Sequence, residues 1–272
     1  MTMIRMPKNR CKQVLVATLW LAISMTVIAQ DDVKTSKNPV QTERSGMLAV
    51  GHTSILDTYL SQETFQGTEI RYTAQSLRQR TNSKISRESS HHLLLSSAGT
   101  RGNNKSLLTA MYNFKIGWYH GWELEGYDIN VRIGGLADGT LGGSYNTRNS
   151  NNPAQARISL SVNPAIRTMW KFRIWKYPLK LNYEVSTPLI GLAFSPNYGQ
   201  SYYEIFSEGN YDHNIVVITP FKAPQLYQRL TLDFKLWRTT LSFGYMGDLR
   251  QMEANSLKYH QYTHAIVLGW KY

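Results

Sequence analysis

The last nine residues of the chain, 264–272, constrain the fold more strongly than any other stretch. Their large side chains recur at every second position: His264, Ile266, Leu268, Trp270 and Tyr272. The positions between them hold Ala, Val, Gly and Lys. Because successive residues of a β-strand point to opposite faces, this period predicts a strand with one apolar, aromatic face and one face of small or charged side chains.

The same alternation recurs throughout the chain and predicts an all-β protein. Residues 108–118 place Leu, Ala, Tyr, Phe, Ile and Trp on one face, and segments 127–134, 179–185, 229–236 and 241–245 alternate in the same way. Several runs reach about 11 to 14 residues, beyond the ~5–6 residues usual in soluble sheets and near the ~9–11 that cross a bilayer. We therefore predict a transmembrane antiparallel up-and-down β-barrel, with a secreted β-sandwich as the alternative.

The connections predict the number of strands. Three segments are expected to be short turns: Tyr119–Gly121, Ile174–Pro178 and Trp237–Thr240. A long loop rich in Gly and Asn is expected over Asp138–Pro153. Short turns of such barrels face the periplasm and long loops face outward. Keeping that parity requires a strand at Gln200–Phe206 paired with residues 212–219, and an early strand at Met47–Ile55. The count is then about twelve strands, and ten is the alternative.

The N-terminal segment is predicted to be a signal peptide. Four basic residues, Arg5, Lys8, Arg10 and Lys12, precede an uncharged apolar run at Val14–Ile28. This run of about 15 residues is shorter than the ~20 of a spanning helix, which disfavours the alternative of a membrane anchor. We expect cleavage before Gln30, a polar periplasmic leader over residues 30–45 and a barrel over 46–272. Cys11 would leave with the signal peptide, so the mature chain would hold no cysteine.

Charge gives a weak indication of partners. Without the four basic residues of the signal segment, the formal charge falls from +12 to +8. The basic residues are dispersed, and no nucleic-acid-binding module is recognisable, so no nucleic-acid partner is predicted. An exported basic protein is expected to meet outer-membrane lipid headgroups or lipopolysaccharide instead.

One block is distinctive: Ser186–Phe206, which contains Ser-Thr-Pro-Leu and Ser-Pro-Asn-Tyr-Gly-Gln-Ser-Tyr-Tyr-Glu. Together with Ile55–Ser61 it resembles a family of Bacteroidota outer-membrane barrel proteins of unknown function. In that family a Ser-Pro-x-Tyr-Gly-x-Ser-Tyr-Tyr-Glu stretch follows a Thr-Pro-Leu strand end. The resemblance covers most of the mature chain and implies an outer-membrane location and a barrel fold, but no activity. The C-terminal strand likewise resembles the closing strand of such barrels, which implies the barrel assembly machinery as a partner.

Five residues of this block are predicted to bind a ligand: Tyr198, Gln200, Tyr202, Tyr203 and Glu204. Aromatic rings with hydroxyl groups, next to an amide and a carboxylate, suit contact with a sugar or a lipid headgroup. The alternative is an interfacial aromatic belt with a structural loop that plugs the barrel, because aromatic girdles are expected in any such barrel.

No catalytic, metal or cofactor site is predicted. Outer-membrane phospholipase carries a His-x-Ser-Asn-Gly motif, and the nearest segment here, His91–Gly99, lacks the Ser-Asn-Gly step. Asp212-His213-Asn214 is another candidate for catalysis. His91 and His92 would point to opposite faces of a strand, and His260 and His264 would lie about 13 Å apart, so neither pair suits one metal ion.

The charged residues on the wet faces of the predicted strands indicate a mixed-charge lumen. They are Lys115, Arg132, Arg229, Asp233, Lys235, Asp248 and Arg250. In a barrel of this size they predict a narrow or filled interior held by hydrogen bonds and ion pairs. The favoured function is a non-catalytic structural or binding barrel. A small-solute pore or uptake barrel is the first alternative, and an outer-membrane lipid hydrolase is the second.

Overall fold

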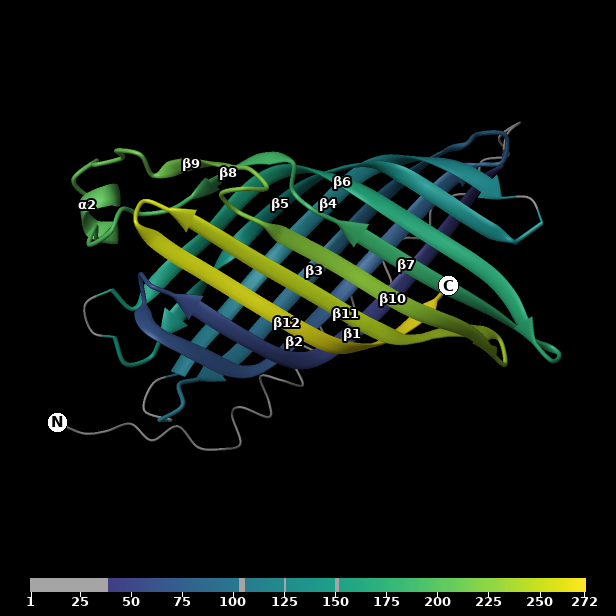
Figure 1. The fold of residues 1–272 in the computed structure, drawn as a ribbon, viewed down its shortest axis with the longest axis horizontal. Helices are drawn as coiled ribbons and strands as arrows, with labels where there is room; N and C mark the ends of the chain where they lie inside the picture. Colours follow the sequence, from purple (N-terminus) through teal and green to yellow (C-terminus); the bar gives the residue numbers. More distant parts are fainter. Residues whose placement is uncertain (1–38, 103–105, 125, 150–151) are drawn as a thin grey trace. The chain divides into compact units, whose positions relative to one another are not determined.

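The computed structural model describes residues 39–102, 106–124, 126–149 and 152–272, which are mostly β-strand (Figure 1). The elements follow in this order: β1 (Val40–Asp57), β2 (Ser61–Arg80), β3 (Ile85–Gly99), β4 (Ser106–Leu124), β5 (Ile129–Asn146), β6 (Ala154–Ile174), β7 (Tyr177–Ser186), β8 (Ile190–Phe194), α2 (Tyr202–Phe206), β9 (Ile215–Ile218), β10 (Gln225–Leu236), β11 (Thr239–Ala254) and β12 (Leu257–Lys271). No helix in these ranges has the length and apolar character needed to cross a membrane. The predicted signal peptide lies outside the described residues.

Ten of the twelve strands close into an antiparallel barrel. The wall runs β1-β2-β3-β4-β5-β6-β7-β10-β11-β12, and the ring closes because β12 pairs with β1 and β5 pairs with β6. The remaining two strands lie outside this ring, since β8 pairs with β6 and β9 pairs with β8. The predicted antiparallel barrel is confirmed, with twelve strands in total and ten in the wall.

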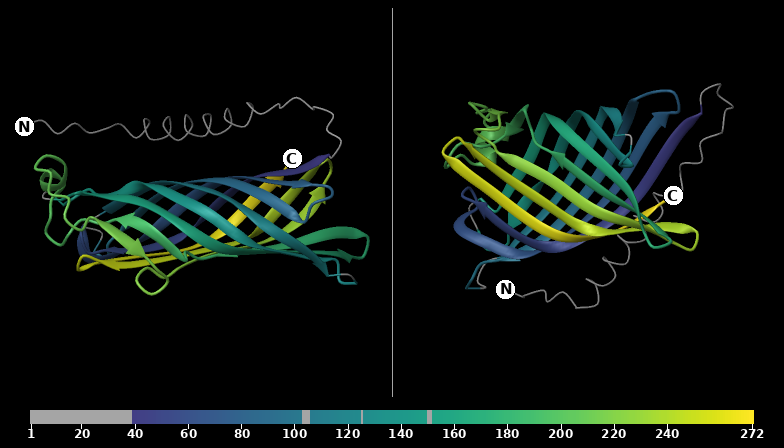
Figure 2. Two further views of the ribbon diagram at one scale, coloured as in Figure 1. Left: turned by 90° about the horizontal axis from the view of Figure 1, so that it is seen from above. Right: turned by 45° about the vertical axis from the view of Figure 1, so that its right-hand side comes forward.

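One row of paired residues shows how the barrel closes. The row starts at Leu48 of β1. In one direction around the ring it passes through Tyr72, Leu93, Tyr112 and Leu141 and ends at Ile158. In the other direction it passes through Leu268, Phe243, Leu232 and Leu181 and ends at Trp170. Both directions end on β6, at residues twelve positions apart. One circuit therefore shifts the register by 12 residues, which requires tilted strands, and Figure 2 shows strands that run obliquely. Every member of this row is apolar or aromatic.

Burial is inverted relative to a soluble protein. Leu93 and Leu141 on the outer face are 46% and 60% exposed, whereas Glu69 and Arg71 in the lumen are 1% and 2% exposed. A sandwich would bury its apolar faces against each other. An apolar exterior around a polar interior is what a lipid-facing barrel requires.

The C-terminal strand follows its predicted pattern. In β12, Ile266 and Leu268 are exposed on the outer face, whereas Ala265 and Val267 are buried in the lumen. Both neighbours hold this strand, since residues 257–271 pair with β11 and residues 259–271 pair with β1. The strand thus supplies the seam that closes the ring.

The predicted strand at Gln200–Phe206 is wrong, because this segment contains the helix α2. The Ser201 hydroxyl accepts a hydrogen bond from the amide of Glu204, and the Glu204 carboxylate accepts one from the amide of Ser201. This capping box satisfies amides at the start of a helix, which favours a helical turn over an extended strand. The segment expected to pair with it, residues 212–219, contains the strand β9, but β9 pairs with β8.

The predicted connections are confirmed in part. The chain turns at 175–176 and at 237–238, as expected. Tyr119–Gly121, however, lies inside β4, and Asp138–Asn146 lies inside β5. Gly142 explains the second difference: a Cβ there would lie 2.3 Å from the carbonyl oxygen of Ala110, so this glycine permits close strand pairing and marks no turn.

The first strand begins earlier than predicted. β1 starts at Val40, which pairs with Arg80 of β2, so residues 40–45 belong to a strand although the sequence analysis placed them in the leader. Alternation is weak in this segment because most of its residues are polar or charged. The cross-strand partner, rather than the local sequence, extends the strand.

The two ends of the barrel differ. The terminal end, where β1 begins and β12 ends, carries the turns at 81–84, 175–176 and 237–238. The opposite end, called the loop end below, carries the connection 187–224 with β8, α2 and β9 (Figure 1). Ten wall strands place both termini of the barrel at the same end.

Candidate functional site

Gln200, one of the five predicted ligand-binding residues, forms hydrogen bonds inside the loop-end connection. Its side-chain carbonyl oxygen accepts hydrogen bonds from the amide of Asn197 at 3.0 Å and from the side chain of Asn214 at 2.7 Å. Its amide nitrogen donates to the carbonyl oxygen of Asn210. The Tyr59 hydroxyl donates to its backbone carbonyl oxygen at 2.9 Å and ties this connection to the turn between β1 and β2.

Tyr202 attaches α2 to the barrel. Its hydroxyl donates to the Gln155 side chain at 3.0 Å and accepts from the amide of Ala156 at 2.6 Å. Its ring meets Tyr59 edge-on, with ring centroids 5.9 Å apart. Burial raises the pKa of both phenols above their usual range, so both stay protonated at neutral pH.

The other three predicted residues do not gather with Gln200 and Tyr202 around a common binding site. Glu204 caps α2. Tyr198 and Tyr203 are 69% and 67% exposed. The structure therefore places the five residues on one connection, where three hold it together and two face outward. Their role in ligand binding stays a prediction.

A cluster of charged and polar side chains crosses the lumen, and the alternation pattern of the sequence does not indicate that its members meet. It consists of Gln75, Glu88, Arg167, Glu184 and Arg229 and is called the cross-lumen cluster below. Arg167 bonds Glu88 at 2.7 Å, and Arg229 bonds Glu184 and Gln75 at 2.7 Å each. Gln75 donates to Glu88 at 2.6 Å.

The members of this cluster come from opposite sides of the ring. Gln75 and Glu88 project from β2 and β3, whereas Arg167, Glu184 and Arg229 project from β6, β7 and β10. Four strands lie between β3 and β10 along the ring in either direction. The hydrogen bonds therefore span the full width of the lumen.

A second buried network lies beside this cluster. Arg71 bonds Glu69 and Asp248 at 2.7 Å each, and Arg250 bonds Asp248 at 2.8 Å. Glu69 also accepts from the side chain of Gln261 at 2.9 Å. Buried charges persist when they are paired in this way. The predicted mixed-charge, filled lumen agrees with these contacts, although Lys235 is exposed near the terminal end of its strand.

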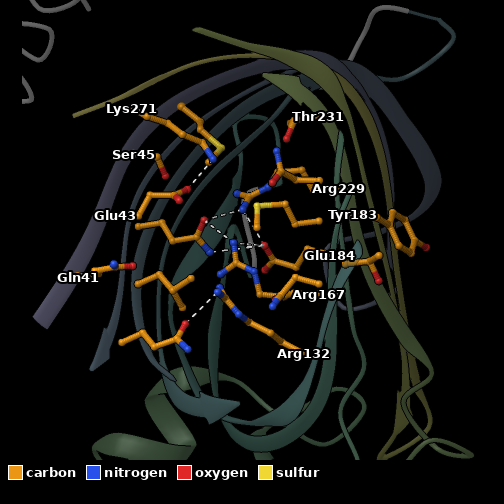
Figure 3. A pocket seen from close by; sticks show the side chains of 18 residues that line it. Gln41, Glu43, Ser45, Arg132, Arg167, Tyr183, Glu184, Arg229, Thr231 and Lys271 are labelled. Atoms are coloured by element: carbon orange, nitrogen blue, oxygen red, sulfur yellow. Dashed lines mark hydrogen bonds and ion pairs between the residues drawn. The ribbon is translucent and has the colours of Figure 1, made fainter. Parts of the chain in front are cut away.

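A cavity of about 110 Å³ lies on the terminal side of the cross-lumen cluster (Figure 3). Its charged lining residues are Glu43, Arg132, Arg167, Glu184, Arg229 and Lys271, four cations against two anions. The Glu43 side chain is 46% exposed, so the cavity opens toward the terminal end. We call it the terminal-side cavity.

Arg132 differs from the other cations of this cavity. Its guanidinium donates to the side-chain oxygen of Gln79 at 3.0 Å, and no carboxylate among the described residues forms an ion pair with it. Arg167, Arg229 and Lys271 each bond at least one carboxylate. Arg132 therefore keeps donors that an anion could use.

A second cavity, of about 80 Å³, lies on the loop side and is called the loop-side cavity. It shares no lining residue with the terminal-side cavity. Its lining includes Lys115, Arg157, Tyr227, Arg250 and Tyr259. The Arg157 guanidinium bonds Asp57 and lies 3.5 Å from the ring centroid of Tyr259.

The two proposed catalytic segments do not form an accessible catalytic group. His92 lies 3.3 Å from the Ser90 hydroxyl and 3.0 Å from the Thr73 hydroxyl, so no carboxylate or amide orients its ring as in a hydrolase triad. Ser90 and His92 are buried and line neither cavity. The adjacent Asp212 and His213 contact each other at a highly exposed position.

Metal ligands do not gather in the described ranges, where no three His, Cys, Asp or Glu side chains could share an ion. His91 is exposed on the outer face and His92 is buried in the lumen. The two side chains therefore point to opposite faces of the strand, as predicted from their adjacency.

Comparison with known proteins adds a family and a set of similar folds. The sequence matches a family described as "Protein of unknown function (DUF3316)" over residues 14–271. No curated protein matches it. The outer membrane protease OmpT from Escherichia coli is 7% identical, with a TM-score of 0.47 over 89% of this chain and 99% of that chain. The beta domain of the Bordetella autotransporter BrkA is 9% identical, with a TM-score of 0.44 over 85% and 98%. Neisserial surface protein A is 8% identical, with a TM-score of 0.34 over 86% and 97%.

Proposed function

We propose that this chain, which belongs to the DUF3316 family of proteins of unknown function, is a non-catalytic outer-membrane β-barrel with a closed lumen that binds a small anion at its periplasmic end. The observation that carries the proposal is the cross-lumen cluster. It links opposite walls of the barrel by charge-assisted hydrogen bonds, which are the strong members of their class.

The membrane location is supported by the ring of apolar residues on the exterior. The terminal end faces the periplasm in this proposal, because most of its connections are short turns whereas the loop end carries the connection 187–224. Export through a Sec signal peptide and an origin in Bacteroidota are part of the proposal.

A small-solute pore is the weaker alternative. Conduction needs a continuous polar path, and the cross-lumen cluster lies between two cavities that have no lining residue in common. Opening the path would break several buried ion pairs at once. Each broken pair would leave an uncompensated charge in the lumen.

The binding role is supported by the terminal-side cavity. Four cations against two anions give its lining a net positive charge, and Arg132 has a neutral amide, Gln79, as its partner. A site of this kind suits a phosphate or carboxylate group, because the guanidinium fork matches such oxygens. The cavity has room for a small anion with a few waters, since one water needs about 10–15 Å³.

Replacing Arg132 with glutamine is expected to weaken binding of inorganic phosphate by about tenfold or more, since a hydrogen bond to a charged group contributes about 1.5–3 kcal/mol. Isothermal titration of the refolded barrel measures this. Arg238→Gln is the matched control, because Arg238 is an exposed arginine at the same end and lies outside the cavity. If phosphate does not bind the wild-type barrel, or if both variants bind equally, the proposed anion site is wrong.

Two partners complete the proposal. Outer-membrane lipid or lipopolysaccharide would contact the apolar exterior, and the barrel assembly machinery would receive the chain through β12. The exposed Ile266 and Leu268 and the aromatic end of that strand support the second partner. A lipid hydrolase is not favoured by any catalytic geometry in the described residues.

A further inference from the structure

Outside the ten-strand ring, at the loop end, a groove lies between β9 and the last residues of β11. In the described part of the chain, β9 pairs with β8 along one edge and has no strand on the other. β11 pairs with β10 up to Arg250. Beyond that point the amides of Gln251 and Glu253 bond the carbonyl oxygens of Pro224 and Lys222. A groove of about 500 Å³, called the wall gap below, is lined by β9, residues 221–223 and residues 252–255.

The wall gap adjoins the apolar outer face of the barrel. Leu160, Leu192 and Val217 pair across β6, β8 and β9 and extend the apolar exterior up to the gap. Each of them is about half exposed or more. Phe221, which lines the gap, is 95% exposed. Eight of the twelve lining residues are apolar, and the polar ones are His213, Lys222, Glu253 and Asn255. A mainly apolar groove beside lipid suits an acyl chain.

Two apolar side chains separate the wall gap from the loop-side cavity. Ile218 and Met252 line both spaces. Ile218 is 2% exposed and packs in one cluster with Ala193 and Ala223. Met252 packs against this cluster. Methionine is unbranched and adapts its shape readily. Ile218 and Met252 would have to move for the two spaces to join.

The loop-side cavity offers unused hydrogen-bond donors behind that partition. Arg157 and Tyr227 are 8% and 6% exposed and line the cavity, and the Nε of Arg157 and the hydroxyl of Tyr227 have no partner among the described residues. The charged lining residues are Lys115, Asp138, Arg157, Asp248 and Arg250, with one cation in excess. A buried donor without a partner costs free energy, which an acceptor would recover.

We propose that the wall gap admits a long-chain fatty acid from the membrane, with its acyl chain in the gap and its carboxylate in the loop-side cavity. A carboxylate accepts hydrogen bonds, and Arg157 Nε and the Tyr227 hydroxyl are the unpartnered donors among the residues of this lining. The cavity of about 80 Å³ holds a carboxylate with a few waters, whereas a phosphocholine or sugar headgroup needs more room. This site lies opposite the terminal-side cavity and does not depend on the anion proposed there.

Binding of palmitate to the refolded wild-type barrel tests this proposal, with hexadecanol and lysophosphatidylcholine as comparison ligands and protein-free micelles as the background. We expect palmitate to bind more tightly than either. Tyr227→Phe removes one unpartnered hydroxyl and should weaken palmitate about three- to tenfold while leaving hexadecanol unchanged. Tyr198→Phe, at an exposed tyrosine outside the cavity, is the control and should change neither.

Ile218→Trp is expected to fill the partition and to weaken both palmitate and hexadecanol at least tenfold. Heat-modifiable migration on gels checks that each variant is folded, and Tyr227→Phe provides the test if Ile218→Trp does not fold. The proposal is overturned if palmitate does not bind the wild type, or if lysophosphatidylcholine binds more tightly. It is also overturned if folded Tyr227→Phe binds palmitate as the wild type does.

Discussion

Replacing Glu88 with glutamine is expected to lower the free energy of unfolding of the barrel by about 3–5 kcal/mol, because removing one partner of a buried pair leaves the other charge uncompensated. Glu88 is fully buried and bonds Arg167 at 2.7 Å. The next carboxylate oxygen, on Glu184, lies 3.7 Å from Arg167 and is shared with Arg229. Urea unfolding of the barrel in lipid vesicles, followed by tryptophan fluorescence, measures the loss.

Glu253→Gln is the matched control for this substitution. Glu253 also forms an ion pair, with Lys258 at 3.7 Å, but both side chains are more than half exposed. Exposed pairs contribute about 0–1 kcal/mol because water screens them. Equal losses for the two variants would show that Glu88 does not hold a buried cluster together.

Replacing Gly51 with alanine is expected to open the seam between β1 and β12. A Cβ at Gly51 would lie 2.0 Å from the carbonyl oxygen of His264 and 2.4 Å from the Cα of Ala265. Overpacking costs about 1–3 kcal/mol when side chains can yield, and here backbone atoms obstruct, so the cost should reach or exceed that range. The fraction of protein that migrates as the compact, unheated form on gels should fall sharply.

Gly135→Ala is the control, since a Cβ at that glycine of β5 meets no atom within 4 Å. It should leave the compact form unchanged. If Gly51→Ala also leaves the compact form unchanged, the close approach of β1 and β12 at Gly51 is wrong.

Much of the fold follows from a period of two residues in the sequence. Outward residues such as Leu93 and Leu268, and inward ones such as Asp233, are separated by alternation alone, because the pleat assigns them to opposite faces. The predictions that proved wrong have local causes. Gly142 signals a turn by composition, but its neighbour strand requires a glycine. The stretch at Ser201 and Glu204 contains a capping box, which outweighs the aromatic residues that favour a strand.

The cross-lumen cluster illustrates what a single sequence leaves open. Alternation indicates that Arg229 and Glu184 face inward, but Glu88 meets Arg167 only because the ring closes with a register shift of 12 residues. That shift depends on every pairing around the barrel. The unpartnered donors of Arg157 and Tyr227 have the same origin, because a missing partner is a property of the assembled lumen.

Single-channel recording of the wild-type barrel in planar bilayers is the most direct test of the closed lumen. The cross-lumen cluster predicts that purified, heat-modifiable protein adds no stepwise conductance at any voltage in potassium chloride, whereas a general porin inserted under the same conditions does. Discrete, reproducible current steps from the folded wild-type protein would contradict the closed lumen and favour the pore.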